Sequence, residues 1–153
     1  MKGGRRMTLL TVLILVVVAA MAYVRLSPLD VNRWHRAPSA DLPAGEHPGT
    51  GRFTGVYPQA SEAAAAFQRL HDVALATPRT EVLAGSPAEG MVTYATRSRA
   101  IGFPDMTTAV LEPGETDGAG VIRIYARLRF GRSDMGVNKA RVRDWVSRAG
   151  LAR

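Results

Sequence analysis

Cysteine is absent from the 153-residue chain. Without thiols the protein has no disulfide framework, no thiolate ligands for zinc or iron–sulfur clusters and no cysteine nucleophile. Its three histidines, His35, His47 and His71, all precede the arginine-rich motifs described below. They support neither a Ser-His-Asp triad nor a histidine metal cluster, and the common nucleotide-binding glycine motifs are missing. We therefore predict no catalytic residue, metal or cofactor.

Acidic residues are fewer than basic ones, 13 against 20, which gives a net charge of +7. The excess sits at the two ends of the chain. Residues 1–24 carry three basic side chains and no acidic one, and residues 121–153 carry nine basic and two acidic ones. Such basic ends are typical of proteins that meet nucleic acid, anionic lipid or an acidic partner, and composition does not choose among these.

Residues 7–24 form one long apolar run without a charge. As a helix the run would be about 27 Å long, close to the roughly 30 Å of a bilayer core. We predict a transmembrane helix over 7–24, a cytoplasmic tail over 1–6 and an extracytoplasmic, periplasmic domain in a single-pass inner-membrane protein. A cleaved signal peptide, ending at the small-residue site Ala20-Met21-Ala22, is the alternative and would release a secreted domain. Either topology makes nucleic acid an unsuitable partner.

Residues 25–60 have the composition of a tether. Four prolines and four glycines fall within residues 36–60, a density at which regular structure is disfavoured. Trp34, Phe53 and Tyr57 are unusual in a free linker. We expect these aromatic side chains on the domain surface or at the bilayer interface.

The residues that follow, 61–151, have the pattern of a single α+β domain. A helix is expected from Ser61 until Pro78 stops it, and a second one from Asn138 to Gly150. The expected strands are 80–84, 92–99, 106–112 and 121–130. The last of these alternates apolar residues with Arg123, Tyr125, Arg127 and Arg129. The order predicts a four-stranded antiparallel meander with both helices packed on one face and the other face open.

Two motifs resemble the domain of unknown function 1499 family. The first is R-S-R-A-I-G-F-P-D over residues 97–105, and the second, more specific one is F-G-R-S-D-M-G-V-N-K-A-R-V over residues 130–142. The resemblance covers roughly residues 60–151. It implies a small bacterial or plastid domain, often behind a membrane segment, with no established activity. Typical members have S-R-S-R where this chain has A-R-L-R over 126–129, which argues against a catalytic role for those serines here.

The arginines of these motifs form the main candidate site. Arg97 and Arg99 share one strand face, as do Arg127 and Arg129, so a meander would place two pairs about 9–10 Å apart if one strand separates them. Guanidinium groups suit phosphate or carboxylate oxygens. The alternative is a network of surface ion pairs with Asp105, Asp134 and other carboxylates, which stabilises little.

The loop before the last helix extends this candidate anion site. Arg132 and Ser133 lie where backbone N–H groups and a helix start can receive an anion. Asp134, Gly136 and Asn138 support the motif, and Asp134 and Asn138 are also good helix-capping residues, so capping is the structural alternative.

Together these features predict a membrane-tethered, extracytoplasmic binding or accessory module with an arginine-rich face. The expected partners are the membrane, crossed once, and an anionic ligand such as lipid headgroups, an acidic envelope polymer or an acidic protein. Two alternatives stay open. One is an enzyme that acts on an anionic envelope substrate with Asp105 or Asp134 as acid and base, and the other is a purely structural subunit.

Overall fold

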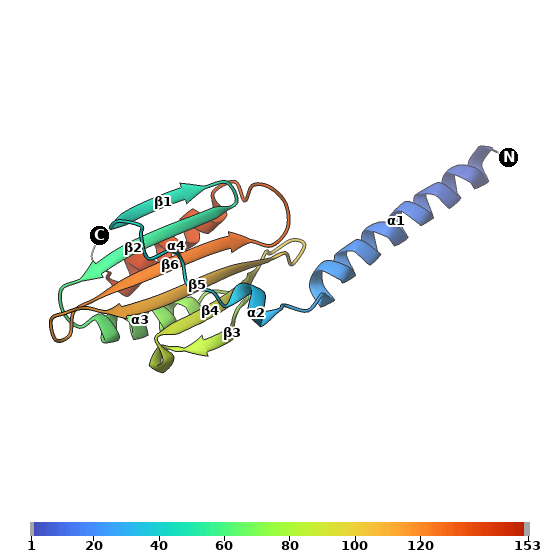
Figure 1. Ribbon diagram of the computed structural model, residues 1–153. Coiled ribbons are helices and arrows are strands. Elements are labelled where there is room, and N and C mark those ends of the chain that lie inside the picture. The colour runs from blue at the N-terminus through green and yellow to red at the C-terminus, as the bar shows by residue number, and fades with distance from the viewer. Residues whose placement is uncertain (1, 152–153) are drawn as a thin grey trace.

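The computed structural model describes residues 2–151, an apolar N-terminal helix followed by an α+β domain (Figure 1). The helices are α1 (Lys2–Leu26), α2 (Val31–Trp34), α3 (Ala63–Leu75) and α4 (Val137–Ala149), with a 3-10 turn η1 (Pro87–Glu89). The strands are β1 (Gly45–Gly49), β2 (Arg52–Gln59), β3 (Thr80–Ser86), β4 (Met91–Arg97), β5 (Pro104–Pro113) and β6 (Gly120–Leu128).

All six strands form one antiparallel sheet in the order β1-β2-β6-β5-β4-β3. The predicted meander β3 to β6 is present, but the prediction of four strands is wrong. The two additional strands, β1 and β2, come from residues 45–59, where we expected an irregular tether. Proline is tolerated here because β1 is an edge strand, and β2 is held by continuous pairing with β6 from Arg52 to Gln59.

One face of the sheet carries the larger buried cluster, which includes side chains of α3 and α4. Phe67 and Leu70 of α3 and Trp145 of α4 are at most 2% exposed and pack with Tyr94 and Ile124 of the sheet. Figure 1 shows both helices behind the sheet. Phe53 and Tyr57 also belong to this cluster, so their predicted surface position is wrong.

The other face is not open, as we expected it to be. Trp34 of α2 packs there against Ala95 and Met106, and is itself buried. His35 shares a hydrogen bond with Thr93 of β4, and Thr108 of β5 donates to the carbonyl of Trp34. The segment between α1 and β1 is therefore a cover over the second face of the sheet, and helices are not confined to one face.

Helix α1 stands apart from the domain (Figure 1). Its segment Gly4–Leu26 is long and apolar enough to cross a membrane, and almost all of it is unburied. A membrane anchor and a signal sequence both have these properties.

Candidate functional site

The two sequence motifs meet at the end of the sheet from which α1 leaves. In an antiparallel sheet alternate turns lie at the same end, so four connections gather here: residues 50–51, 76–79, 98–103 and 129–136. We call this the α1-side end. The connections 60–62, 87–90 and 114–119 make up the far end. Figure 1 shows the two ends on opposite sides of the domain.

Arg127 shares a sheet face with Arg97, as its register predicts, but its guanidinium is engaged within the protein. It donates to the carbonyl of Trp34 at 2.6 Å and to Oγ1 of Thr108 at 2.9 Å. It also stacks over the rings of Trp34 and Tyr125, 5.3 and 4.5 Å from their centroids. Burial lowers the pKa of Arg127. This arginine holds the cover segment on the sheet.

Arg129 has a similar structural role next to α1. It donates to Oγ and the carbonyl of Ser27 and to the carbonyl of Pro28. Arg25 donates to the carbonyl of Ile101 in the 98–103 loop, at 3.1 Å. The last turn of α1 and the two residues that follow it are thus hydrogen-bonded directly to the α1-side end.

The remaining predicted arginines are more accessible. Arg97 lies 3.8 Å from Glu81, an exposed carboxylate, and Arg99 and Arg132 are exposed on their loops. Within residues 2–151 no carboxylate forms an ion pair with Arg99 or Arg132. The structure therefore separates the predicted set into two bonded arginines, 127 and 129, and a group with free donor capacity.

The loop before α4 serves the helix start. The carboxylate of Asp134 accepts the backbone N–H groups of Gly136 and Asn138, and Ser133 accepts that of Met135. These hydrogen bonds lower the pKa of Asp134 despite its partial burial. Gly136 has φ 83°, a left-handed conformation that favours glycine.

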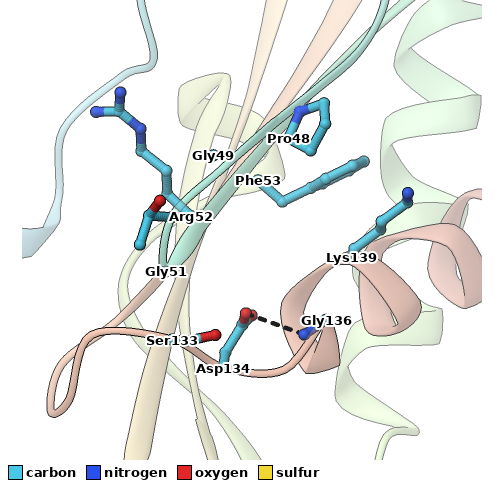
Figure 2. Close-up of a pocket in the computed structure, with 10 residues that line it drawn as sticks. Pro48, Gly49, Gly51, Arg52, Phe53, Ser133, Asp134, Gly136 and Lys139 are labelled. Atoms are coloured by element: carbon cyan, nitrogen blue, oxygen red, sulfur yellow. Dashed lines mark hydrogen bonds between the residues drawn. The ribbon is translucent and has the colours of Figure 1, made fainter.

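Figure 2 shows one cavity at the α1-side end. It has a volume of about 420 Å³ and lies between the β1–β2 turn and the loop before α4. Lys139 contributes positive charge to its lining, and Ser133 and Asp134 contribute oxygen atoms. Arg52 also borders the cavity, but Figure 2 shows its guanidinium directed away from Lys139. Arg52 comes from the segment expected to be a tether, so the sequence reasoning did not find it.

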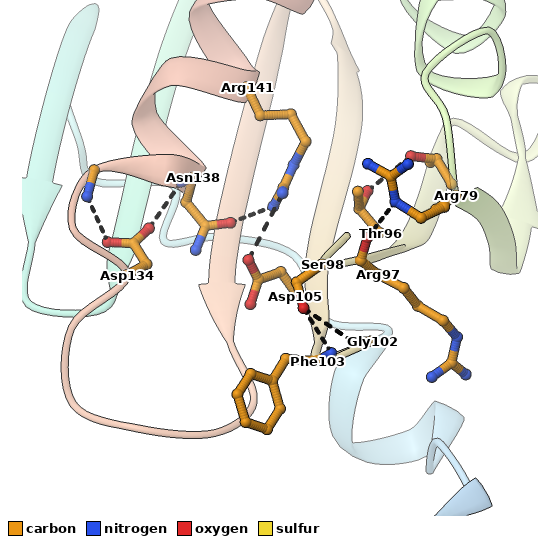
Figure 3. Close-up of polar contacts among 12 residues, drawn as sticks. Arg79, Thr96, Arg97, Ser98, Gly102, Phe103, Asp105, Asp134, Asn138 and Arg141 are labelled. Atoms are coloured by element: carbon orange, nitrogen blue, oxygen red, sulfur yellow. Dashed lines mark hydrogen bonds and ion pairs between the residues drawn. The ribbon is translucent and has the colours of Figure 1, made fainter. Parts of the chain in front are cut away.

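Arg141 is the principal site residue that the sequence reasoning missed. Its side chain is only 9% exposed, lies 3.7 Å from Asp105 and donates to the side-chain oxygen of Asn138 (Figure 3). Asn138 is fully buried. The available signal was the position of Arg141, three residues after Asn138 on one helix face. Burial raises the pKa of Asp105, against the opposing effect of Arg141.

A second cavity, of about 430 Å³, opens beside this buried cluster. It lies between the α3–β3 turn, the end of β4 and the first turns of α4. Its lining includes Arg79, Arg97, Arg99, Asp105, Arg141 and Trp145. Arg99 of the first motif and Arg141 of the second therefore line one hollow, whereas Figure 3 shows the guanidinium of Arg97 pointing away from Asp105.

Comparison with known families shows which family shares this domain. The family model DUF1499, described as a protein of unknown function, matches residues 28–148. The chain belongs to the DUF1499 family. This confirms the resemblance expected from the two motifs and extends it upstream, since the match begins at residue 28 and not near residue 60. The DUF1499 match therefore includes the cover segment and both additional strands.

Comparison with individual proteins adds little to the DUF1499 assignment. No functionally curated protein matches the chain. A crystal structure of a putative uncharacterized protein from Bacillus thuringiensis is similar at 12% identity, with a TM-score of 0.43. The similarity covers 63% of this chain and 90% of that one.

Within the DUF1499 domain the two aspartates differ in their chemistry. Asp134 is kept ionised by its hydrogen bonds to the start of α4, which makes it unsuitable as a proton donor. Asp105 is more buried, has a raised pKa and lines a cavity. Across residues 2–151 no three His, Asp or Glu side chains gather as metal ligands.

Proposed function

We propose that this protein is a membrane-tethered, extracytoplasmic accessory module whose α1-side end rests on an anionic lipid surface. The observation that carries the proposal is the unequal charge of the two ends of the sheet. The four connections at the α1-side end carry four arginines and one acidic residue: Arg79, Arg99, Arg129, Arg132 and Asp134. Arg52, the first residue of β2, adds a fifth arginine at this end. Each basic side chain near an anionic leaflet contributes about 1 kcal/mol to binding.

The far end has the opposite charge. Its three connections carry Glu62, Glu89, Glu115 and Asp117 and no Lys or Arg. A domain with this polarity orients in the field of an anionic membrane with its basic end inward. α1 leaves from the basic end, which is the orientation that a membrane span requires (Figure 1).

Apolar side chains at the α1-side end support the same orientation. Ile101 and Phe103 on the β4–β5 loop are 37% and 36% exposed, and Met135 and Val137 near the start of α4 are 92% and 53% exposed. Apolar residues among basic ones are typical of surfaces that insert into the headgroup region. The hydrogen bonds of Arg25 to the 98–103 loop and of Arg129 to Ser27 would keep these loops at the depth where the span ends.

Anchoring by α1, with the domain in the periplasm of a single-pass inner-membrane protein, is part of this proposal. A cleaved signal would release the domain and leave only the electrostatic attraction. An acidic polymer or acidic protein would meet the same basic end, so the experiment compares lipid with these partners.

The test uses residues 27–153, which keep the cover segment and omit the span. We expect this fragment to sediment with vesicles that contain phosphatidylglycerol, to bind phosphatidylcholine vesicles much less, and to dissociate as salt rises. Arg99→Gln/Arg132→Gln should weaken binding about tenfold or more. Arg36→Gln/Arg148→Gln removes two exposed positive charges outside the α1-side end and is the matched control.

Equal binding to both lipids, or equal loss in both double variants, would disprove docking through the α1-side end. Preferential binding to an acidic polymer over anionic vesicles would mean that the α1-side end binds that polymer and not lipid.

One observation favours a second function. Asp105 combines a raised pKa with a position in a cavity lined by arginines, which is what a general acid for an anionic substrate requires. The test is hydrolysis of an envelope phosphate or carboxylate ester. Activity that is lost in a folded Asp105→Asn variant would establish an enzymatic function.

A further inference from the structure

The cavity beside Asp105 is lined by hydrogen-bond donors and by an acceptor. Arg79, Arg97 and Arg99 line it together with Arg141, and Asp105 contributes a carboxylate. Its volume of about 430 Å³ lies in the range of small-molecule sites. Trp145 and Val137 provide apolar surface next to these charged groups.

The arginines at this cavity retain donor capacity. Arg79 donates through Nε to the carbonyl of Arg97, and within residues 2–151 neither Arg79 nor Arg99 has a carboxylate within ion-pair distance. The guanidinium of Arg97 lies 3.8 Å from Glu81 and donates to the carbonyl of Arg25 at 3.5 Å, so Arg79 and Arg99 are the free donors at this cavity. A guanidinium carries five N–H donors, so most of these donors remain available to an incoming anion.

Asp105 and Arg141 of the lining belong to a buried polar cluster that is only partly satisfied. Asp105, with its side chain 18% exposed, faces Arg141, and Figure 3 shows how Asn138 completes the cluster. Among residues 2–151, Nε of Arg141 and Nδ2 of Asn138 find no hydrogen-bond partner, although both atoms are buried. Unsatisfied buried polar groups are costly and uncommon, and a ligand that enters beside them is one explanation for their retention.

We propose that this cavity binds a small phosphate ester that carries a free hydroxyl group, a glycerophosphate-type group. The phosphate oxygens accept from Arg79 and Arg99, and the hydroxyl donates to the carboxylate of Asp105. Free glycerol phosphate and the headgroup of phosphatidylglycerol both present this chemistry. The cavity adjoins the α1-side end, so both sources have access. Binding of the free ester does not depend on docking to a membrane.

The experiment uses the full chain in phosphatidylcholine nanodiscs, with both tryptophans labelled as 5-fluorotryptophan. Trp145 lines the cavity and donates to Thr77 at 2.8 Å, whereas Trp34 packs on the other face of the sheet. We expect glycerol phosphate to shift the fluorine resonance of Trp145 saturably and to leave that of Trp34 in place. Methyl phosphate, which lacks the hydroxyl, should bind about fivefold more weakly.

Arg79→Gln/Arg99→Gln should weaken this binding about tenfold or more. Arg36→Gln/Arg148→Gln is the matched control, because it removes the same charge from exposed positions outside the α1-side end. The control should bind glycerol phosphate as the unaltered chain does. The Trp145 resonance of each free variant reports whether the core around it is retained.

Nanodiscs of phosphatidylglycerol separate the two sources. A shift of Trp145 in these nanodiscs without added ligand, abolished by Arg79→Gln/Arg99→Gln, assigns the site to the lipid headgroup. A shift with the free ester alone assigns it to a soluble ligand. If Trp145 responds to neither, or if both double variants lose binding equally, the proposal is wrong. Vesicle sedimentation would still test docking separately in that case.

Discussion

Arg127 shows how the role of one residue depends on what covers it. Its alternation with Ile124 and Ala126 on β6 correctly places its side chain away from the main core. A solvent-facing arginine is a candidate ligand for anions, but residues 28–44 cover this face and supply carbonyl oxygens and an aromatic ring. The guanidinium therefore stabilises the folded domain and is not free to bind an anion.

We expect Arg127→Ala to lower the free energy of unfolding by about 2–4 kcal/mol, because it removes two hydrogen bonds and two cation–π contacts. Arg132→Ala, at an exposed position, should change it by less than about 0.5 kcal/mol. Urea unfolding of residues 27–153 measures both values. A stable Arg127→Ala protein with weakened vesicle binding would restore Arg127 to the ligand site.

Asp134 gives a prediction with a pH dependence. Its carboxylate caps the start of α4, and its pKa is lower in the folded protein than its ordinary value of 3.8. The cap therefore contributes stability at pH values above about 3.8, and this contribution is lost as the pH falls through the lower, folded pKa. Asp134→Ala should cost about 1 kcal/mol near pH 7 and little at pH 2.

Urea unfolding at the two pH values tests this, with Asp134→Asn as the control that keeps an acceptor for the helix N–H groups. A cost of Asp134→Ala that is the same at both pH values would mean that the ionised carboxylate is not what stabilises α4.

At the scale of elements, strand β2 has the largest consequence for the fold. It lies between β1 and β6 and contributes Phe53 and Tyr57 to the main core. The composition of its neighbourhood suggested a tether because proline and glycine disfavour strands in general. Pairing with β6 along eight residues and burial of two aromatic rings outweigh that local preference.

We expect a fragment of residues 61–153 to remain unfolded or to aggregate, because removal of β2 exposes the edge of β6 and a large apolar area. Residues 27–153 should fold as a monomer. Circular dichroism and the dispersion of amide resonances distinguish the two. A cooperative unfolding transition for residues 61–153 would show that β1 and β2 are accessory to the domain.

At the scale of the whole molecule, the absence of cysteine makes the proposed orientation measurable. Met135 at the α1-side end and Thr116 at the far end can each be replaced by a single cysteine and labelled with an environment-sensitive fluorophore. In the full chain in phosphatidylglycerol nanodiscs, the Met135→Cys label should emit at shorter wavelength than in phosphatidylcholine nanodiscs. The Thr116→Cys label should not respond. The reverse pattern would place the acidic end against the lipid.

The sequence by itself determined the α+β class, the family, the apolar N-terminal helix and the alternation along β6. These properties follow from composition, motif and short periods, which are local along the chain. Tertiary structure decided the six-stranded sheet, the cover over its second face and the grouping of Arg79, Asp105 and Arg141 at one cavity. Those features depend on contacts between distant residues, whose energies outweigh local preferences and leave no periodic trace in the sequence.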